Sequence, residues 1–121
     1  MTLAVVAGIG LAGGVGAVAR FALDGTVARR VVSEFPLGTL VVNLSGTFTL
    51  GVLVGATVDA DAYRVAGTGL LGGYTTFSTW MFESQRLGED GELALAVLNF
   101  AVSLTLGLVA VWAGRHLGTL L

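Results

Sequence analysis

The stretch from Gly69 to Trp80 decides how this chain folds, and its sequence is GLLGGYTTFSTW. It lies inside a run that is otherwise apolar enough to cross a bilayer, yet glycines, hydroxyls and aromatic rings replace the usual Leu, Ile and Val. Irregular backbone within a bilayer is tolerated only where protein covers it or where it lines a cavity. We therefore expect a membrane helix that is broken at Gly72-Gly73, with the functional site at the break.

The composition of the chain indicates a membrane protein. Of its 121 residues, 55% are hydrophobic and 12% are charged, whereas a typical soluble domain is about 25% charged. There is no cysteine, which excludes disulfides and thiolate metal sites. The net charge of -2, without a basic patch, argues against nucleic acid as a partner.

Four long runs with few charges predict four membrane-spanning helices, because about 20 apolar residues cross the hydrocarbon core as a helix. The runs cover about residues 3–23, 37–58, 63–87 and 93–117. We therefore expect one all-α, multi-pass domain over residues 1–121, located in the cell membrane.

The arginines divide almost evenly between the two predicted membrane faces, so the positive-inside rule does not fix an orientation. One consequence is insertion in both orientations and pairing as an antiparallel, dual-topology dimer. The alternative is a single orientation that other features determine.

Asn43 is the most informative single residue, because it lies in the middle of the second span, where lipid cannot satisfy its amide. Thr39, Asn43 and Thr47 recur every four residues and predict one polar stripe on this helix. Asn43 has two interpretations. It forms an interhelical hydrogen bond that serves packing, or it faces a pore and donates an N–H to an anion.

The broken third span predicts both a cation site and an anion path. Carbonyls freed at Gly72 and Thr75 are candidate ligands for a cation such as Na⁺. Phe77 and Trp80 follow at i, i+3 spacing, and the positive edges of aromatic rings stabilise a passing anion weakly. Packing of these rings against lipid or another helix is the alternative. The hydroxyls between and around these rings, including those of Ser78 and Thr79, favour the interpretation as an anion path.

Two further groups of polar residues are candidates for the same path. In the fourth span, Asn99 and Ser103 predict a second stripe, although Ser103 also fits a hydrogen bond to its own helix. Arg20 and Glu83 lie about one turn inside the ends of their spans, on the same membrane face. They predict an ion pair, independent extension of each side chain to the interface, or an arginine at a pore mouth.

Together these motifs resemble the Fluc, or CrcB-type, family of small fluoride channels, over essentially the whole chain. The matching segments are Gly16–Phe21 (GAVARF), Gly38–Asn43 (GTLVVN) and Gly72–Thr79 (GGYTTFST), with Glu83 downstream. The first segment is weak by itself. The GG-x-TTFST segment with GT-xxx-N upstream is quite specific.

The resemblance implies an antiparallel dimer with two pathways, through which fluoride leaves the cytoplasm passively and its toxicity falls. It also implies a central Na⁺ held by carbonyls at the break, here those of Gly72 and Thr75. The residues that match the family's pathway are Arg20, Thr39, Asn43, Phe77 and Ser103, with Ser78 and Thr79 inside the matching motif.

The chain departs from the family pattern at three positions. Trp80 stands where a second phenylalanine is usual, Asn99 where a tyrosine is usual, and Gly107 where a serine is frequent. The tryptophan is bulkier and carries an N–H donor, so it is expected to narrow the pathway or to bind fluoride differently. The chain is therefore expected to act as a homodimer, or as a partner-dependent subunit of a heterodimer with a paralogue.

Other function classes fit the sequence less well. A small drug-efflux antiporter needs a carboxylate deep in the membrane, but the first span has none and only Glu83 is at all deep. A non-conducting assembly subunit does not need Asn43 or the Gly-Thr-Phe break. An enzyme is not expected, because there is no cysteine, no mid-span histidine and no carboxylate pair.

Overall fold

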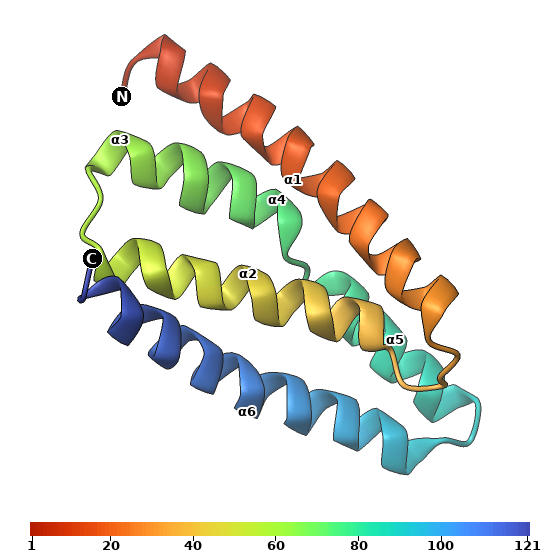
Figure 1. Ribbon diagram of the computed structural model, residues 1–121. Coiled ribbons are helices and arrows are strands. Elements are labelled where there is room, and N and C mark those ends of the chain that lie inside the picture. The colour runs from red at the N-terminus through yellow and green to blue at the C-terminus, as the bar shows by residue number, and fades with distance from the viewer.

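The computed structural model describes residues 1–121 and is entirely helical (Figure 1). Three helices are long and apolar enough to cross a membrane: α1 (Leu3–Arg30), α2 (Leu37–Gly55) and α6 (Leu93–Gly118). The third span is assembled from four pieces: α3 (Ala60–Tyr63), the π-helix η1 (Arg64–Leu71), α4 (Gly72–Tyr74) and α5 (Ser78–Glu89). The predicted all-α fold with a broken third helix is confirmed.

The ends of α1 and α2 differ from the ends of the apolar runs. Helix α1 continues to Arg30 instead of ending near residue 23, and α2 ends at Gly55 instead of near residue 58. A helix does not have to stop where charge begins, since it can extend beyond the hydrocarbon core. Arg29 and Arg30 lie in the last turn of α1, where they suit the negative end of the helix dipole.

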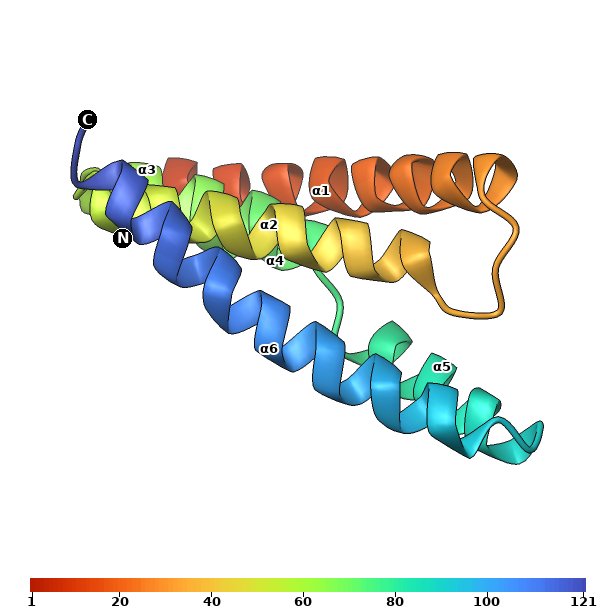
Figure 2. The same ribbon diagram turned by 60° about the horizontal axis from the view of Figure 1, so that its bottom comes forward.

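Helix α2 lies in the middle of the bundle, and the third span changes neighbours as it passes this helix. Before the break, η1 and α4 pack against α1, whereas after the break α5 packs against α6 (Figure 1). Figure 2 shows α6 diverging from α1 toward the end opposite the termini. The break therefore connects two helix pairs, α1 with η1 and α4, and α5 with α6.

Glycines bring neighbouring helices into backbone contact. A methyl group added at Gly73 would lie 2.9 Å from the backbone carbons of Gly13 on α1. At Gly51 on α2 it would lie 2.9 Å from the backbone nitrogen of Arg115 on α6. These close approaches explain why small residues recur in the spans, because they let dispersion contacts form between the helices without intervening side chains.

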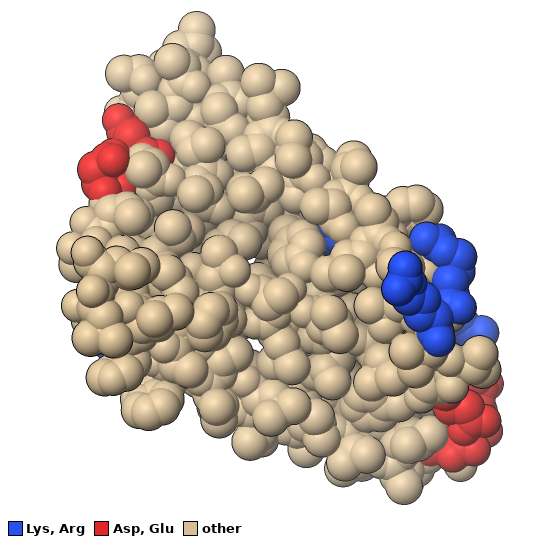
Figure 3. Space-filling view, in the orientation of Figure 1, with Lys and Arg blue, Asp and Glu red and all other residues tan.

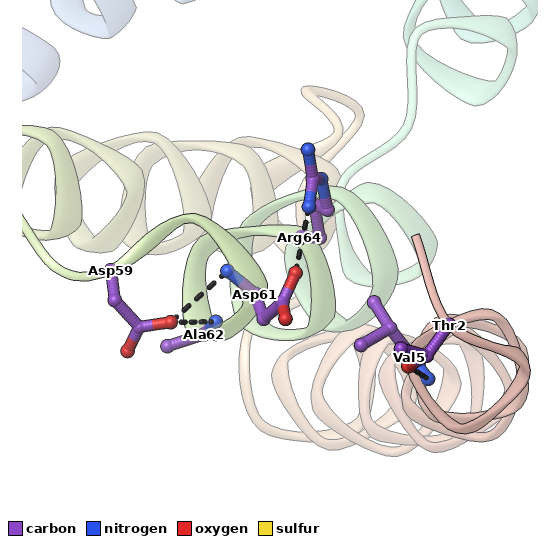
Figure 4. A network of polar contacts seen from close by, with 6 residues as sticks. All are labelled: Thr2, Val5, Asp59, Asp61, Ala62 and Arg64. Atoms are coloured by element: carbon purple, nitrogen blue, oxygen red, sulfur yellow. Dashed lines mark hydrogen bonds and ion pairs between the residues drawn. The ribbon is translucent and has the colours of Figure 1, made fainter.

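On the face that Figure 3 shows, most charged side chains lie at the two ends of the molecule, and the surface between them is uncharged apart from a small basic spot near the centre. At the start of the third span, Asp59 caps α3, and its Oδ1 accepts hydrogen bonds of 3.0 Å from the backbone nitrogens of Asp61 and Ala62 (Figure 4). Arg64 forms an ion pair of 2.7 Å with Asp61 in the next turn. This polar end suits the boundary between the bilayer and water.

Candidate functional site

The backbone of the third span leaves the helix at Thr75, where φ is −80° and ψ is 160°, and the helix resumes at Ser78. Gly72 and Gly73 remain helical within α4. The break therefore follows Gly72-Gly73 and does not lie at these glycines as predicted. Gly73 instead serves the close approach of α4 to α1.

Asn43 of α2 holds the open backbone of the break. Its Nδ2 donates to the carbonyl oxygen of Thr76 at 2.8 Å, and its Oδ1 accepts from the amide nitrogen of Thr76, also at 2.8 Å. A carboxamide can do this because it has a donor and an acceptor side by side, as a peptide group does. The predicted interhelical hydrogen bond of Asn43 is therefore formed, and one amide N–H remains after it.

Several carbonyls at the break lack their helical partners, among them those of Gly72, Gly73 and Thr75. In a continuous helix the amide of Thr76 would donate to Gly72, but it donates to Asn43. Likewise the amide of Thr79 would donate to Thr75, but it donates to Oγ1 of Thr76 at 3.2 Å. No other backbone hydrogen bond at the break replaces them. Gly72 and Thr75 are the two residues that the sequence predicted as cation ligands.

A groove of about 330 Å³ lies beside the break, between α2, α5 and α6. Four of the predicted pathway residues line it together: Asn43, Phe77, Trp80 and Ser103. Apolar side chains such as Leu40 and Leu104 make up much of the remaining wall. A few polar groups on an otherwise apolar surface are typical of a site that binds a small ligand or ion.

The other predicted residues lie elsewhere. A second hollow of about 230 Å³ is lined by Arg20, Thr39 and Thr79, and Thr76 is common to both hollows. The Oγ of Ser78 lies 3.4 Å from that of Thr76, and Ser78 is exposed outside both hollows. Apart from Ser78, the predicted pathway residues thus divide between two hollows that share Thr76 of the break.

Arg20 and Glu83 do not form the predicted ion pair. The hydroxyl of Thr39 donates to Glu83 Oε1 instead, and the only ion pair in the protein joins Arg64 to Asp61. Arg20 shares its hollow with Asp24. The spacing of Arg20 and Glu83 from the span ends gave their depth in the membrane, but not the direction of each side chain around its helix.

Trp80 and Asn99 are bonded to each other, which the sequence did not indicate. The indole Nε1 of Trp80 donates to the carbonyl oxygen of Asn99 at 3.1 Å. In return, Nδ2 of Asn99 lies 3.4 Å from the carbonyl oxygen of Trp80 and donates to Oγ of Ser84 at 2.8 Å. Asn99 is only 1% exposed. Its Oδ1 also accepts from the hydroxyl of Ser103, at 3.4 Å. The alternative interpretation expected Ser103 to bond to the backbone of its own helix, but its partner is a side chain one turn earlier on that helix.

Three aromatic rings follow one another from the groove into the contact between α5 and α6, and only the first two line the groove. Phe77 and Trp80 meet edge to face, with centroids 5.7 Å apart and planes at 87°. Trp80 stacks on Phe100, with centroids 5.4 Å apart. The side chain of Phe77 is 70% exposed, so one side of its ring is open. Contacts between neighbouring rings thus fix Trp80 from two sides.

Comparison with known proteins agrees with the resemblance in the sequence. Residues 7–115 match the family described as CrcB-like protein, Camphor Resistance (CrcB). "Fluoride-specific ion channel FluC 2" of Mycolicibacterium paratuberculosis is 54% identical, with 98% of each chain covered. The protein of the same name from Mycobacterium tuberculosis is 50% identical, with 95% of this chain and 91% of the relative covered. "Fluoride-specific ion channel FluC 1" of Leifsonia xyli subsp. xyli is 40% identical, covering 99% and 90%.

These relatives bear out two further predictions. Their names describe ion channels and not enzymes. An ion channel acts within a membrane, in agreement with the three continuous apolar helices and the broken third span. The match extends over nearly all of the spans described above, including the break and the helices that line the groove. This chain is a multi-pass membrane protein, and it belongs to the CrcB-like protein family.

Proposed function

We propose that this chain is a subunit of a passive, fluoride-selective channel in the cell membrane, which exports fluoride and lowers its toxicity. The observation that carries the proposal is the groove at the break, where the amide of Asn43, the ring of Phe77 and the hydroxyl of Ser103 line one space. The names of relatives up to 54% identical support the same function.

The groove offers fluoride several weak partners in place of water. Asn43 keeps one amide N–H after its hydrogen bonds with Thr76, and the exposed ring of Phe77 presents positively polarised C–H edges. The N–H of Trp80 is directed to Asn99, so Trp80 contributes ring carbon to the wall. An ion passes quickly when each site is strong enough to admit it and weak enough to release it.

We infer that two copies of the chain form an antiparallel dimer. The groove is open on one side, and large apolar side chains outside it are exposed, including Leu11 at 75% and Phe21 at 83% on α1. A second copy would cover such residues and supply the missing wall of each pathway. Self-complementary pairing by a two-fold axis is the commonest arrangement of identical subunits, and the balanced arginines permit both orientations.

We also propose that Na⁺ binds at the dimer interface through the carbonyls of Gly72 and Thr75. The fit rests on the hydrogen bonds of the break, which divert the helical donors of both carbonyls to side chains. Freed carbonyls of broken membrane helices are suitable Na⁺ ligands. When bound, the cation would compensate the negative ends of these carbonyl dipoles where the two copies meet.

A partner-dependent subunit is the second candidate function. Two of the positions that depart from the family pattern are found at the groove. Trp80 lines the groove, and Asn99 accepts the hydrogen bond of its indole. A paralogous chain could then supply residues that this chain lacks. Drug efflux has less support, because Glu83 accepts a hydrogen bond from Thr39 and the first apolar run, residues 3–23, has no carboxylate.

Ion efflux from liposomes tests the proposal. The purified chain is reconstituted alone and with any paralogue encoded beside its gene, into liposomes loaded with fluoride or with chloride. Asn43→Ala is expected to abolish fluoride efflux. Thr49→Ala is the matched control on the same helix. The hydroxyl that it removes lies outside the groove and bonds only to the backbone carbonyl of Ser45.

The outcomes separate the candidates. Fluoride efflux by the chain alone, with chloride retained, supports the homodimeric channel. Fluoride efflux only with the paralogue supports the heterodimer. Retention of fluoride in both preparations, with the protein folded and inserted, overturns the channel proposal in favour of an assembly subunit.

A further inference from the structure

Trp80 and Asn99 are joined by reciprocal hydrogen bonds across the contact between α5 and α6. The side chain of each residue lies within hydrogen-bond distance of the backbone carbonyl of the other, at 3.1 Å for the indole and 3.4 Å for the amide. Asn99 is almost completely buried and lies outside the groove, whereas Trp80 lines it. The buried residue therefore acts on the groove only through the lining residues that it bonds, Trp80 and Ser103.

We propose that Asn99 is a positioning residue, which holds Trp80 with its indole N–H turned away from the ion path. This inference rests on the proposed channel function. It gives a role to the side chain of Asn99, which is 1% exposed and has hydrogen bonds at both Nδ2 and Oδ1. It also states what the ion meets at this position, which is aromatic carbon and not a hydrogen-bond donor.

The physical argument concerns how strongly an anion is held. A free indole N–H in a groove with few polar groups would donate a charge-assisted hydrogen bond, about twice as strong as a neutral one. Such a bond would retain the ion and slow its passage. Directing the N–H to the carbonyl of Asn99 removes that donor, while the stacked ring of Phe100 fixes the plane of the indole.

The supporting contacts explain why Asn99 is needed in addition to its own carbonyl. Its Nδ2 donates to Ser84 at 2.8 Å, one turn beyond Trp80 on α5, and its Oδ1 accepts from Ser103 on α6. The bond to Ser84 ties α5 to α6 at the level of the indole, and the bond from Ser103 holds the amide within α6. Without the side chain, the carbonyl of Asn99 remains, but its position relative to Trp80 is no longer fixed.

Fluoride efflux tests the proposal when Asn99→Leu is made both in the parent chain and in the variant Trp80→Phe. With Trp80 present, Asn99→Leu is expected to lower the fluoride efflux rate about tenfold, the effect of about one hydrogen bond. In Trp80→Phe, where there is no N–H to release, Asn99→Leu is expected to change the rate less than about threefold. Equal losses in both backgrounds would mean that Asn99 serves only packing and would overturn the proposal.

Ser84→Ala provides a milder variant in case Asn99→Leu does not fold. It removes the partner of Asn99 Nδ2 without changing a groove residue, and it is expected to slow fluoride efflux in the same direction. Thr49→Ala is the control for loss of a hydroxyl that bonds to its own helix. An unchanged rate for Ser84→Ala, with Asn99→Leu unfolded, counts against the proposal.

Fluorescence tests the positioning independently of ion flow. The chain has two tryptophans, so Trp112→Phe leaves Trp80 as the only one, and Trp112 is 69% exposed outside the groove. In this background Asn99→Leu is expected to raise acrylamide quenching of Trp80 about twofold, since its ring is released. Unchanged quenching overturns the inference even if the channel conducts. Raised quenching supports it even if the parent chain shows no efflux, in which case the proposed function alone fails.

Discussion

The carboxamide of Asn43 forms two hydrogen bonds with the backbone of Thr76, each 2.8 Å long, across 33 residues of sequence. The second span thereby satisfies the backbone that the third span exposes at its break. The two interpretations of Asn43, packing and ion contact, do not exclude each other, because one N–H is used for the break and the other remains. Structure and conduction at this site therefore depend on the same side chain.

Asn43→Leu is expected to lower the free energy of unfolding by about 3 kcal/mol, because it leaves both the N–H and the C=O of Thr76 without partners in a largely apolar setting. Unfolding in mixed detergent micelles measures this loss. Thr47→Val is the control on the same helix and the same groove, with an expected loss below about 1 kcal/mol. Similar losses for the two variants would show that the bonds to Thr76 do not stabilise the break.

Gly73→Ala and Gly72→Ala are expected to have different effects. The new methyl at Gly73 would lie 2.9 Å from the backbone carbons of Gly13, so α4 must move away from α1 at a cost of about 1–3 kcal/mol. At Gly72 the nearest atom, the carbonyl oxygen of Gly67, is 3.9 Å away. Gly72→Ala should therefore keep the stability of the monomer and weaken the proposed dimer.

Unfolding and dimer content, measured together in detergent, separate these two effects. Gly73→Ala should shift the unfolding transition, and Gly72→Ala the proportion of dimer. A stable dimer in Gly72→Ala at low protein concentration would argue against an interface at this glycine.

The sequence predicted the broken third helix correctly because the break changes local composition. Its position was predicted too early, since Gly72 and Gly73 were taken as the flexible point. The position is decided by Asn43, which takes the amide of Thr76 from the helix. Local composition shows that aliphatic residues are lacking around the break. It does not show a contact between residues that are 33 positions apart.

The site was predicted only in part for a related reason. Thr39, Asn43 and Thr47 were expected to form one stripe, but Thr39 lines the second hollow while Asn43 and Thr47 line the groove. Four residues of an α-helix turn through about 400°, so a four-residue repeat drifts around the helix by about 40° per step. Trp80 and Asn99 were both noticed as unusual residues, but no periodicity joins positions on two different helices.

Removal of Na⁺ is expected to weaken the dimer if the carbonyls of Gly72 and Thr75 hold this ion. A ligand present at a hundred times its Kd stabilises the state that binds it by about 2.7 kcal/mol, and exchange for a large organic cation removes that contribution. Dimer content and fluoride efflux at several Na⁺ concentrations, at constant ionic strength, measure the effect. Dependence on ionic strength alone, and not on Na⁺, would contradict the proposed site.

Charge reversal of Arg20 and Glu83 tests whether these residues form the ion pair that the sequence suggested or have separate surroundings, as in the structure. If the two residues formed an ion pair, Arg20→Glu combined with Glu83→Arg would recover what each single variant lost. In the structure Glu83 accepts from Thr39, and Arg20 lies in a hollow with Asp24. The two losses should therefore add within about 0.5 kcal/mol, because the residues do not share a bond.

The control for this reversal is the ion pair that the structure does contain. Arg64 and Asp61 are 2.7 Å apart and 44% and 56% exposed, so each single reversal should cost less than about 1 kcal/mol and the double reversal should recover most of it. Unfolding in mixed micelles compares the two pairs under the same conditions. Recovery at Arg20 and Glu83 equal to that of the control pair would place these two side chains in contact. Thr39 would then not be the partner that holds Glu83.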